Sequence, residues 1–263
     1  MIALRHPTHR HPSVTRPMLR TRLSCAALVA LASVLGLSQA HAATLAGWDV
    51  HALTGGTNAF GASPLAATTT VANLTVGGLT RGSGVGTTGT AAARGWGGSD
   101  WATTSAAAAV TAGDVFTFTV AASAGYKVSI SGIGRFDYRR SSTGPTTGVL
   151  QYQIGSGAFV DAAALSFSST SSSGASVPAI DLSGVAALQN VPAGTTITFR
   201  VVNYAASGAG GTWYLYDTAN TTASDLEISG TVSVAGPAVN GSCGTAQGLT
   251  FPRVPTVGLC ADG

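Results

Sequence analysis

Apolar residues in this chain recur mostly at every second position, in short runs that end at glycine- or proline-rich turns. Alternation of this kind predicts β-strands with one buried face, because successive side chains of a strand point to opposite sides of the sheet. No amphipathic helix longer than two turns can be recognised. We therefore expect an all-β fold, an antiparallel β-sandwich with a jelly-roll-like topology. The predicted strands include residues 115–120, 126–130, 135–139, 150–154, 197–201, 213–216 and 226–234.

Local signals refine this expectation in three places. The runs at residues 115–120 and 126–130 are separated by a short segment that ends in Gly125, which predicts a β-hairpin between them. Residues 61–112 contain few large apolar side chains, so we expect long loops with two strands there. Residues 181–188 favour one short helical turn.

The first 42 residues have the three parts of a secretory signal. Arg20 and Arg22 precede the apolar residues 23–37, and Ala-His-Ala at residues 40–42 provides a small-x-small cleavage site. The apolar run is shorter than the ~20 residues that a bilayer-spanning helix needs, which favours a cleaved signal over an uncut anchor. Met18 is a second candidate for the start. We expect a secreted or cell-surface protein with no transmembrane segment after cleavage.

The predicted signal also accounts for the basic character of the chain, whose net charge is +3. Five of the 13 Lys and Arg residues precede residue 43, which leaves eight against ten acidic residues, a net charge of −2. The charge of residues 43–263 thus gives no indication of a nucleic-acid partner.

Residues 43–234 form the expected β-sandwich domain, and residues 235–263 a linker with a small cysteine-bearing tail. An exported chain can oxidise Cys243 and Cys260 to a disulfide. The closed loop would contribute ~3 kcal/mol by the chain-entropy estimate. Metal binding is the alternative, although two thiolates without a further ligand make an incomplete zinc site.

The tail carries N-G-S-C-G at residues 240–244 and L-C-A-D-G at residues 259–263, with Pro252 and Pro255 between them. This pattern resembles a small cysteine module of bacterial surface proteins. In that family the module continues into a Trp-rich stretch with further cysteines, often before a sorting signal. The resemblance therefore implies either a truncated module or a degenerate end, and it leaves cysteines beyond residue 263 as alternative partners.

The β-domain carries A-G-W-D at residues 46–49, G-L-T-R-G at 78–82, F-D-Y-R-R at 136–140 and, after Asp217, L-E-I at 226–228. These pieces are similar to a domain of exported bacterial proteins. Some of those proteins carry sorting tags, and some place the domain beside an extracellular nuclease. The resemblance implies no activity that can be assigned to individual residues.

Two strands carry candidate binding residues. Tyr214 and Tyr216 share one strand face and could present two rings for stacking on sugars, unless both pack in the core. Arg135 and Arg139 flank Asp137 on a polar strand face that could bind an anionic glycan or phosphate. The alternative for that face is a set of internal ion pairs, each worth less than ~1 kcal/mol.

Three acidic residues near the end of the domain are candidate calcium ligands. Asp225 and Glu227 share a strand face, and Asp217 lies a few residues before them. Carboxylate oxygens suit Ca²⁺, so a structural calcium is one interpretation. A solvated strand edge is the other.

Signals for catalysis are weak. His51 is the only histidine after residue 42, and Asp49 could orient it, but no G-x-S-x-G motif provides a nucleophile. Residues 84–89 match G-x-G-x-x-G, but their flanks are loop-like rather than strand and helix, so we treat the match as chance.

We therefore predict a non-enzymatic module that binds glycan or extracellular matrix, supports adhesion or spaces other domains. The alternative is an accessory, non-catalytic domain of a nuclease-type extracellular hydrolase whose catalytic part lies outside this chain. An enzyme in its own right is disfavoured, because residues 43–263 contain one histidine and one glutamate.

Overall fold

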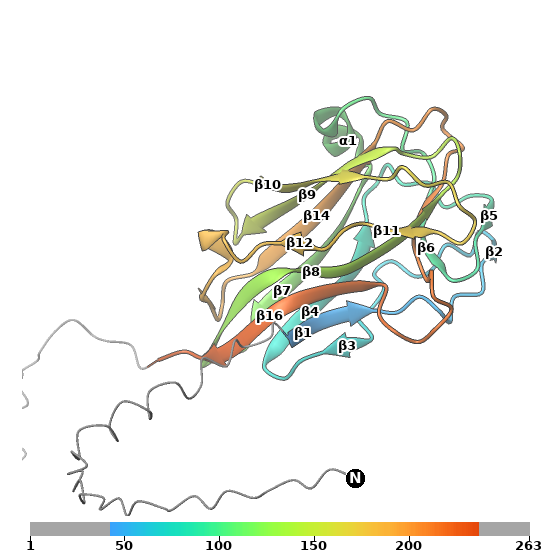
Figure 1. Cartoon of the computed structure of the whole chain (residues 1–263). Coiled ribbons are helices and arrows are strands. Elements are labelled where there is room, and N and C mark those ends of the chain that lie inside the picture. Colours follow the sequence, from blue (N-terminus) through green and yellow to red (C-terminus); the bar gives the residue numbers. More distant parts are fainter. Residues whose placement is uncertain (1–42, 237–263) are drawn as a thin grey trace, which may run out of the picture. The chain divides into compact units, whose positions relative to one another are not determined.

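A computed structural model describes residues 43–236 of the chain (Figure 1). The predicted signal and the tail with Cys243 and Cys260 lie outside the described residues. Strands dominate, and antiparallel sheets pack against each other, which confirms the predicted all-β sandwich. Within the described part, no helix is long and apolar enough to cross a membrane.

The first sheet is built around one long strand. Its pairing path runs through β3 (Thr69–Thr70), β1 (Ala43–Trp48), β16 (Leu226–Val234), β8 (Tyr126–Arg140), β15 (Trp213–Tyr216) and β6 (Gly95–Gly98), each strand hydrogen-bonded to the next. The short strands β11 (Ala175–Ser176), β12 (Ile180–Asp181) and β13 (Val191–Pro192) also pair with β8.

The second sheet has the order β10 (Val160–Ser166), β9 (Thr147–Ile154), β14 (Ile197–Tyr204), β7 (Val115–Ala122) and β4 (Leu74–Arg81). A separate two-stranded sheet joins β2 (Gly56–Thr57) to β5 (Thr90–Ala91). Within residues 43–236, the helical elements are α1 (Ala106–Ala112) and the 3-10 turn η2 (Ala186–Leu188), which confirms the helical turn expected within residues 181–188.

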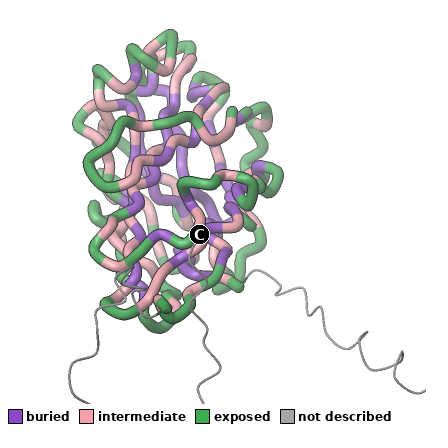
Figure 2. The backbone as a smooth tube through the Cα atoms, turned by 90° about the vertical axis from the view of Figure 1, so that its left-hand side faces the viewer, coloured by how far each residue is buried: buried purple, intermediate pink, exposed green. Residues whose placement is uncertain are grey.

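Aromatic side chains from both sheets fill the space between them. Phe116 and Phe118 point inward from β7, as their alternation with polar residues predicts. The ring of Trp213 from the opposite sheet lies 5.4 Å from that of Phe116 and 6.0 Å from that of Phe136. Figure 2 shows the buried segments lining the interior of the domain, with exposed segments around them.

The predicted hairpin between residues 115–120 and 126–130 is wrong. β7 pairs with β4 and β14 in one sheet, whereas β8 pairs with β16 in the other. The amide of Tyr126 donates to the carbonyl of Ser123 at 3.0 Å, so the chain does turn here. Both strands bury their apolar faces in the same core from opposite sides, and the turn therefore crosses between the sheets.

Residues 61–112 hold more regular structure than the sequence predicted. Besides β3, β4, β5 and β6, the segment contains α1, which begins after Ser105, whose hydroxyl accepts from the amide of Ala108 at 3.2 Å. β6 is rich in glycine because it pairs closely with β15. A Cβ atom on Gly97 would lie 2.0 Å from the carbonyl oxygen of Trp213.

β8 is longer than any of its neighbours, and its pairing partners change along its length. β16 follows one edge of β8 from Tyr126 to Phe136, and β15 continues along that edge from Tyr138 to Arg140. The loop that joins β15 to β16 therefore lies over the point on β8 where one partner ends and the next begins. Charged side chains converge there.

Candidate functional site

Three aspartates meet where β15 and β16 succeed each other along β8. Asp217 directly follows β15, Asp225 directly precedes β16, and Asp137 lies on β8 itself. All three residues are at most 1% exposed. Backbone hydrogen bonds fix the positions of Asp137 and Asp225. The amide of Asp137 donates to the carbonyl of Asp225 at 2.8 Å, and the amide of Asp225 donates to the carbonyl of Trp48 at 2.7 Å.

The carboxylate of Asp217 organises the loop between β15 and β16. Its Oδ1 accepts from the amides of Ala219 at 3.1 Å and Asn220 at 2.7 Å. Its Oδ2 lies 2.8 Å from Nδ1 of His51 and 3.6 Å from a guanidinium nitrogen of Arg94. Burial alone would raise the pKa of Asp217, but the hydrogen bonds and the charge of Arg94 outweigh it and lower the pKa.

The buried carboxylate of Asp137 also has several hydrogen-bond donors. Its Oδ2 accepts from Nε of Arg135 and from the hydroxyl of Thr218, both at 2.8 Å. Its Oδ1 accepts from the hydroxyl of Ser176 at 2.5 Å. These donors satisfy the hydrogen-bonding capacity of the buried carboxylate, which thereby ties three segments of the chain together.

Asp225 has far fewer partners. Its Oδ2 accepts from the amide of Val50 at 2.9 Å, but its buried Oδ1 has no hydrogen-bond partner among the described residues. Arg135 lies 3.8 Å from that oxygen. Burial, followed by the repulsion of Asp217 and Asp137, raises the pKa of Asp225 to about 7 against the opposing effects of Val50 and Arg135.

The calcium prediction gains no support from this arrangement. Both carboxylate oxygens of Asp217 already have partners, namely loop amides, His51 and Arg94. Glu227 accepts from the hydroxyl of Thr44 at 3.4 Å. Across residues 43–236, no group of three or more His, Cys, Asp or Glu side chains could hold a metal ion. The alternative of a solvated strand edge is wrong for Asp217 and Asp225, because both are buried.

His51 pairs with a different acid from the one that its sequence neighbourhood indicated. Asp49 accepts the backbone amide of His51 at 2.7 Å, whereas the imidazole pairs with Asp217, 166 positions away. Among the hydrogen bonds of residues 43–236, no hydroxyl bonds to the imidazole. The pair therefore lacks the nucleophile that a Ser-His-Asp arrangement requires.

The predicted tyrosine platform is covered rather than open. Trp213 and Leu215 fill the core, and the opposite strand face carries Tyr214 and Tyr216, each only 4% exposed. Tyr214 stacks on Phe60 with a centroid distance of 6.0 Å and an interplanar angle of 9°. The segments before β6 fold over this face of β15, which sequence alternation cannot reveal.

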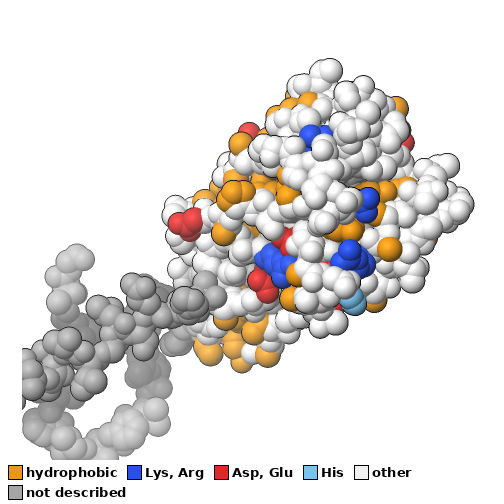
Figure 3. All heavy atoms as spheres, turned by 45° about the vertical axis from the view of Figure 1, so that its right-hand side comes forward, with side chains coloured by type: hydrophobic (Ala, Val, Ile, Leu, Met, Phe, Trp, Pro, Cys, Tyr) orange, Lys and Arg blue, Asp and Glu red, His pale blue; other side chains and the backbone are white. Residues whose placement is uncertain are grey.

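Arginines cover the other tyrosine. The guanidinium carbons of Arg94 and Arg139 lie 5.4 Å and 5.2 Å from the ring centroid of Tyr216. Arg94 also donates to the hydroxyl of Tyr216 at 3.2 Å. Figure 3 shows basic and acidic side chains, with a histidine beside them, close together on one face of a largely uncharged surface.

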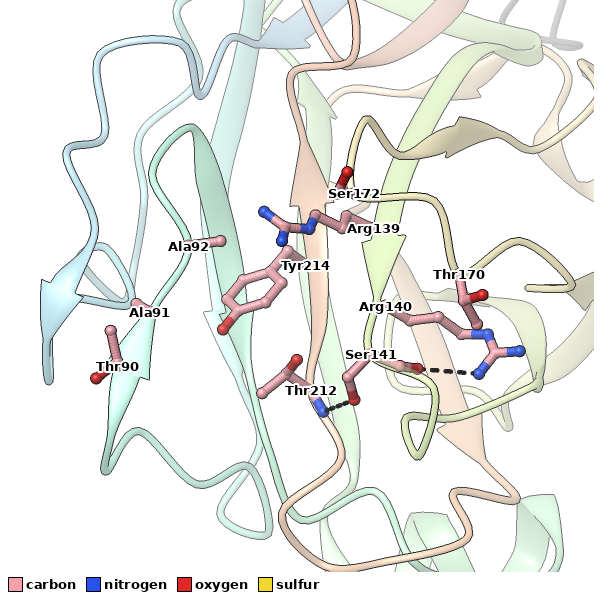
Figure 4. A pocket seen from close by; sticks show the side chains of 10 residues that line it. All are labelled: Thr90, Ala91, Ala92, Arg139, Arg140, Ser141, Thr170, Ser172, Thr212 and Tyr214. Atoms are coloured by element: carbon pink, nitrogen blue, oxygen red, sulfur yellow. Dashed lines mark hydrogen bonds between the residues drawn. The ribbon is translucent and has the colours of Figure 1, made fainter.

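A cavity of about 400 Å³ opens beside Tyr214, between β5, β8, β15 and the loop that follows β10 (Figure 4). Of the four predicted binding residues, Tyr214 and Arg139 line it, whereas Arg135 and Tyr216 do not. The complete lining consists of Thr90, Ala91, Ala92, Arg139, Arg140, Ser141, Thr170, Ser172, Thr212 and Tyr214. We call this cavity the β15 pocket.

The two arginines of the β15 pocket differ in their surroundings. Arg140 is buried and donates to backbone carbonyls, including those of Ser141 at 3.0 Å and Gly144 at 3.3 Å. Arg139 is partly exposed, and its side chain makes no ion pair or hydrogen bond within the described residues. Figure 4 shows its side chain beside the ring of Tyr214, directed away from Arg140.

Comparisons of the chain with protein-family models, with curated proteins and with solved structures gave no match. The β15 pocket and the aspartate cluster therefore have to be interpreted from their own geometry.

Proposed function

We propose that this chain is an exported, non-enzymatic β-sandwich module that binds glycan in the β15 pocket. The observation that carries the proposal is the lining of the pocket. Five serine and threonine residues, a tyrosine ring and the partnerless guanidinium of Arg139 face one cavity. Hydroxyls that both donate and accept match the hydroxyl-rich surface of a sugar, while the largely buried Tyr214 contributes to the pocket wall rather than an open stacking face.

A binding role fits better than hydrolysis. Glycoside hydrolysis uses two carboxyl groups that flank the scissile bond, and no Asp or Glu lines the β15 pocket. The nearby carboxylates of Asp137 and Asp217 are buried and saturated with donors from the protein itself. Their contacts support a role in holding the walls of the pocket.

Obstruction of the β15 pocket tests the proposal. Ser172 is an exposed lining residue, so the larger side chain of Ser172→Trp is expected to fill the cavity and weaken glycan binding at least tenfold, the equivalent of ~1.4 kcal/mol. Binding is measured by a glycan array and then by isothermal titration with the best glycan.

Ser173→Trp is the matched control, because Ser173 lies in the same exposed loop but does not line the pocket. This variant is expected to bind like the unmodified protein. Equal binding by both tryptophan variants would move glycan recognition away from the pocket. An array without any bound glycan would contradict the proposed function itself.

Export is part of the proposal and has its own test. The described domain starts with β1 at Ala43, the first residue after the predicted cleavage site. The intact mass of the protein recovered from a secreting bacterial host is expected to correspond to a chain that begins at Ala43. It should also be two hydrogens lighter before reduction, if Cys243 and Cys260 are bridged. A mass that includes residues 23–37 would contradict cleavage.

A further inference from the structure

The charges around the β15 pocket are not balanced. Of the arginines on this side of the domain, Arg94 and Arg135 each pair with a buried carboxylate, namely Asp217 and Asp137. Arg139 and Arg140 have no carboxylate partner within residues 43–236. Four arginines of the described residues have no carboxylate partner, namely Arg81, Arg139, Arg140 and Arg200, and two of them, Arg139 and Arg140, line the pocket.

Most N–H donors of Arg140 are already used by backbone carbonyls and are not free to bind a ligand. Its Nε donates to the carbonyl of Phe167, and its terminal nitrogens donate to other carbonyls of the two neighbouring loops. Its positive charge nevertheless remains, because carbonyl groups carry no net charge. Arg140 therefore contributes a fixed, buried positive charge to the wall of the pocket.

Arg139, in contrast, keeps its hydrogen-bond donors available. Its guanidinium packs over the face of Tyr216, which supports the side chain without using its N–H groups. Stacking of this kind holds a long side chain in place and reduces the entropy lost when a ligand binds. A guanidinium that is positioned, charged and unpaired suits a planar or tetrahedral oxyanion, which it can bind through two parallel hydrogen bonds.

We infer that the β15 pocket recognises an acidic sugar, that is, a sugar unit of an anionic polysaccharide that carries a carboxylate or sulfate group. Arg139 binds the anionic group, the charge of Arg140 adds to the attraction, and the serine and threonine hydroxyls bind the sugar hydroxyls. The inference rests on the proposed function, and it specifies the class of glycan for the same pocket. Carboxylate and sulfate share the oxyanion chemistry, so the test uses polymers of each kind.

The test compares three polymers and three proteins by affinity electrophoresis and isothermal titration. Polygalacturonate carries carboxylates, heparin carries mainly sulfates, and dextran is neutral. The unmodified protein is expected to bind at least one acidic polymer at least tenfold more tightly than dextran. Arg139→Gln is expected to lose at least tenfold of that affinity, because it removes the charge and the paired donors.

Arg200→Gln is the matched control for unspecific attraction of a polyanion. Arg200 is also a partly exposed arginine stacked on an aromatic ring, 3.6 Å from the centroid of Phe159, but it lies on β14 of the other sheet. This variant removes the same charge and is expected to bind like the unmodified protein. An equal loss in both arginine variants would overturn the inference, since net charge alone would then explain binding.

The remaining outcomes separate this inference from the proposed function. Tight dextran binding that survives Arg139→Gln but is lost in Ser172→Trp would overturn the acidic-sugar inference and keep the glycan pocket. Binding of no polymer would contradict both. Circular dichroism checks the fold of each variant. If Arg139→Gln fails to fold, Arg139→Lys takes its place, because it keeps the charge and loses the paired geometry; unchanged affinity in that variant would overturn the inference.

Discussion

Replacement of Asp217 by alanine is expected to lower the free energy of unfolding by about 3–5 kcal/mol. The carboxylate is 0% exposed, and it is the common acceptor for the loop amides of Ala219 and Asn220 and for the imidazole of His51. Without it, these donors lose their acceptor, and Arg94 loses its counter-charge. The expected loss is large because the variant leaves polar groups unpaired as well as removing one interaction. Urea unfolding measures it.

Two other substitutions provide a scale for the stability loss expected in Asp217→Ala. His51→Ala removes one donor to Asp217 and leaves the acceptor solvated on that side, so a smaller loss of about 1–2 kcal/mol is expected. Asp181→Ala removes an exposed carboxylate whose hydrogen bond is local, to the amide of Ser183, and should change the unfolding midpoint little. If Asp217→Ala unfolds at the same urea concentration as Asp181→Ala, Asp217 does not hold the loop together.

The periodicity of the sequence was sufficient to predict individual strands. Runs such as residues 213–216 and 226–234 coincide with β15 and β16. Alternation also separated Trp213 and Leu215, which fill the core, from Tyr214 and Tyr216 on the opposite face. These features depend on local geometry, since the direction of a side chain on a strand follows from its position alone.

Features that depend on how distant segments meet were not predictable in this way. The turn before Tyr126 was visible in the sequence, but a turn signal does not tell whether the next strand returns to the same sheet or crosses to the other. The segments before β6 cover Tyr214, although nothing in the run at residues 213–216 indicates a covering partner. Both errors concern tertiary pairing rather than secondary structure.

Part of the aspartate cluster is foreshadowed by the positions of its acidic residues in the sequence. Asp217 and Asp225 stand at the end of one predicted strand and the start of the next, in a chain with only ten acidic residues. Acids at strand ends are candidates for organising the loop between those strands. Their burial, and the approach of Arg135 to Asp225, come from the change of partner along β8, which the sequence does not encode locally.

The uneven partners of these aspartates lead to a second large effect, a dependence of stability on pH. The pKa of Asp225 is raised from the ordinary value of 3.8 to about 7 in the folded protein. Between these values the folded state binds more protons than the unfolded state, so the free energy of unfolding falls as the pH rises. The full displacement corresponds to as much as about 4 kcal/mol, lost between about pH 4 and pH 7. Urea unfolding across pH 4–8 measures this slope.

Two other carboxyl groups modify the profile. Burial also raises the pKa of Asp114, which gives a contribution of the same sign, so part of the slope will persist without Asp225. The lowered pKa of Asp217 has the opposite sign: its contribution is present above the unfolded pKa and is lost as the pH falls through the folded value. Stability is therefore expected to be highest in mildly acidic solution.

Asp225→Asn isolates the contribution of the raised carboxyl group. Asparagine can still accept from the amide of Val50 but carries no titratable proton, so the variant should lose most of the slope and exceed the unmodified protein in stability at pH 8. Asp161→Asn, which alters an exposed carboxylate on β10, should keep the slope. A parallel decline in all three proteins would assign the pH dependence to other groups. A clearly shallower slope in Asp225→Asn alone would mean that Asp225 is protonated where the protein is most stable, because its buried Oδ1 lacks the donors that the carboxylate of Asp217 has.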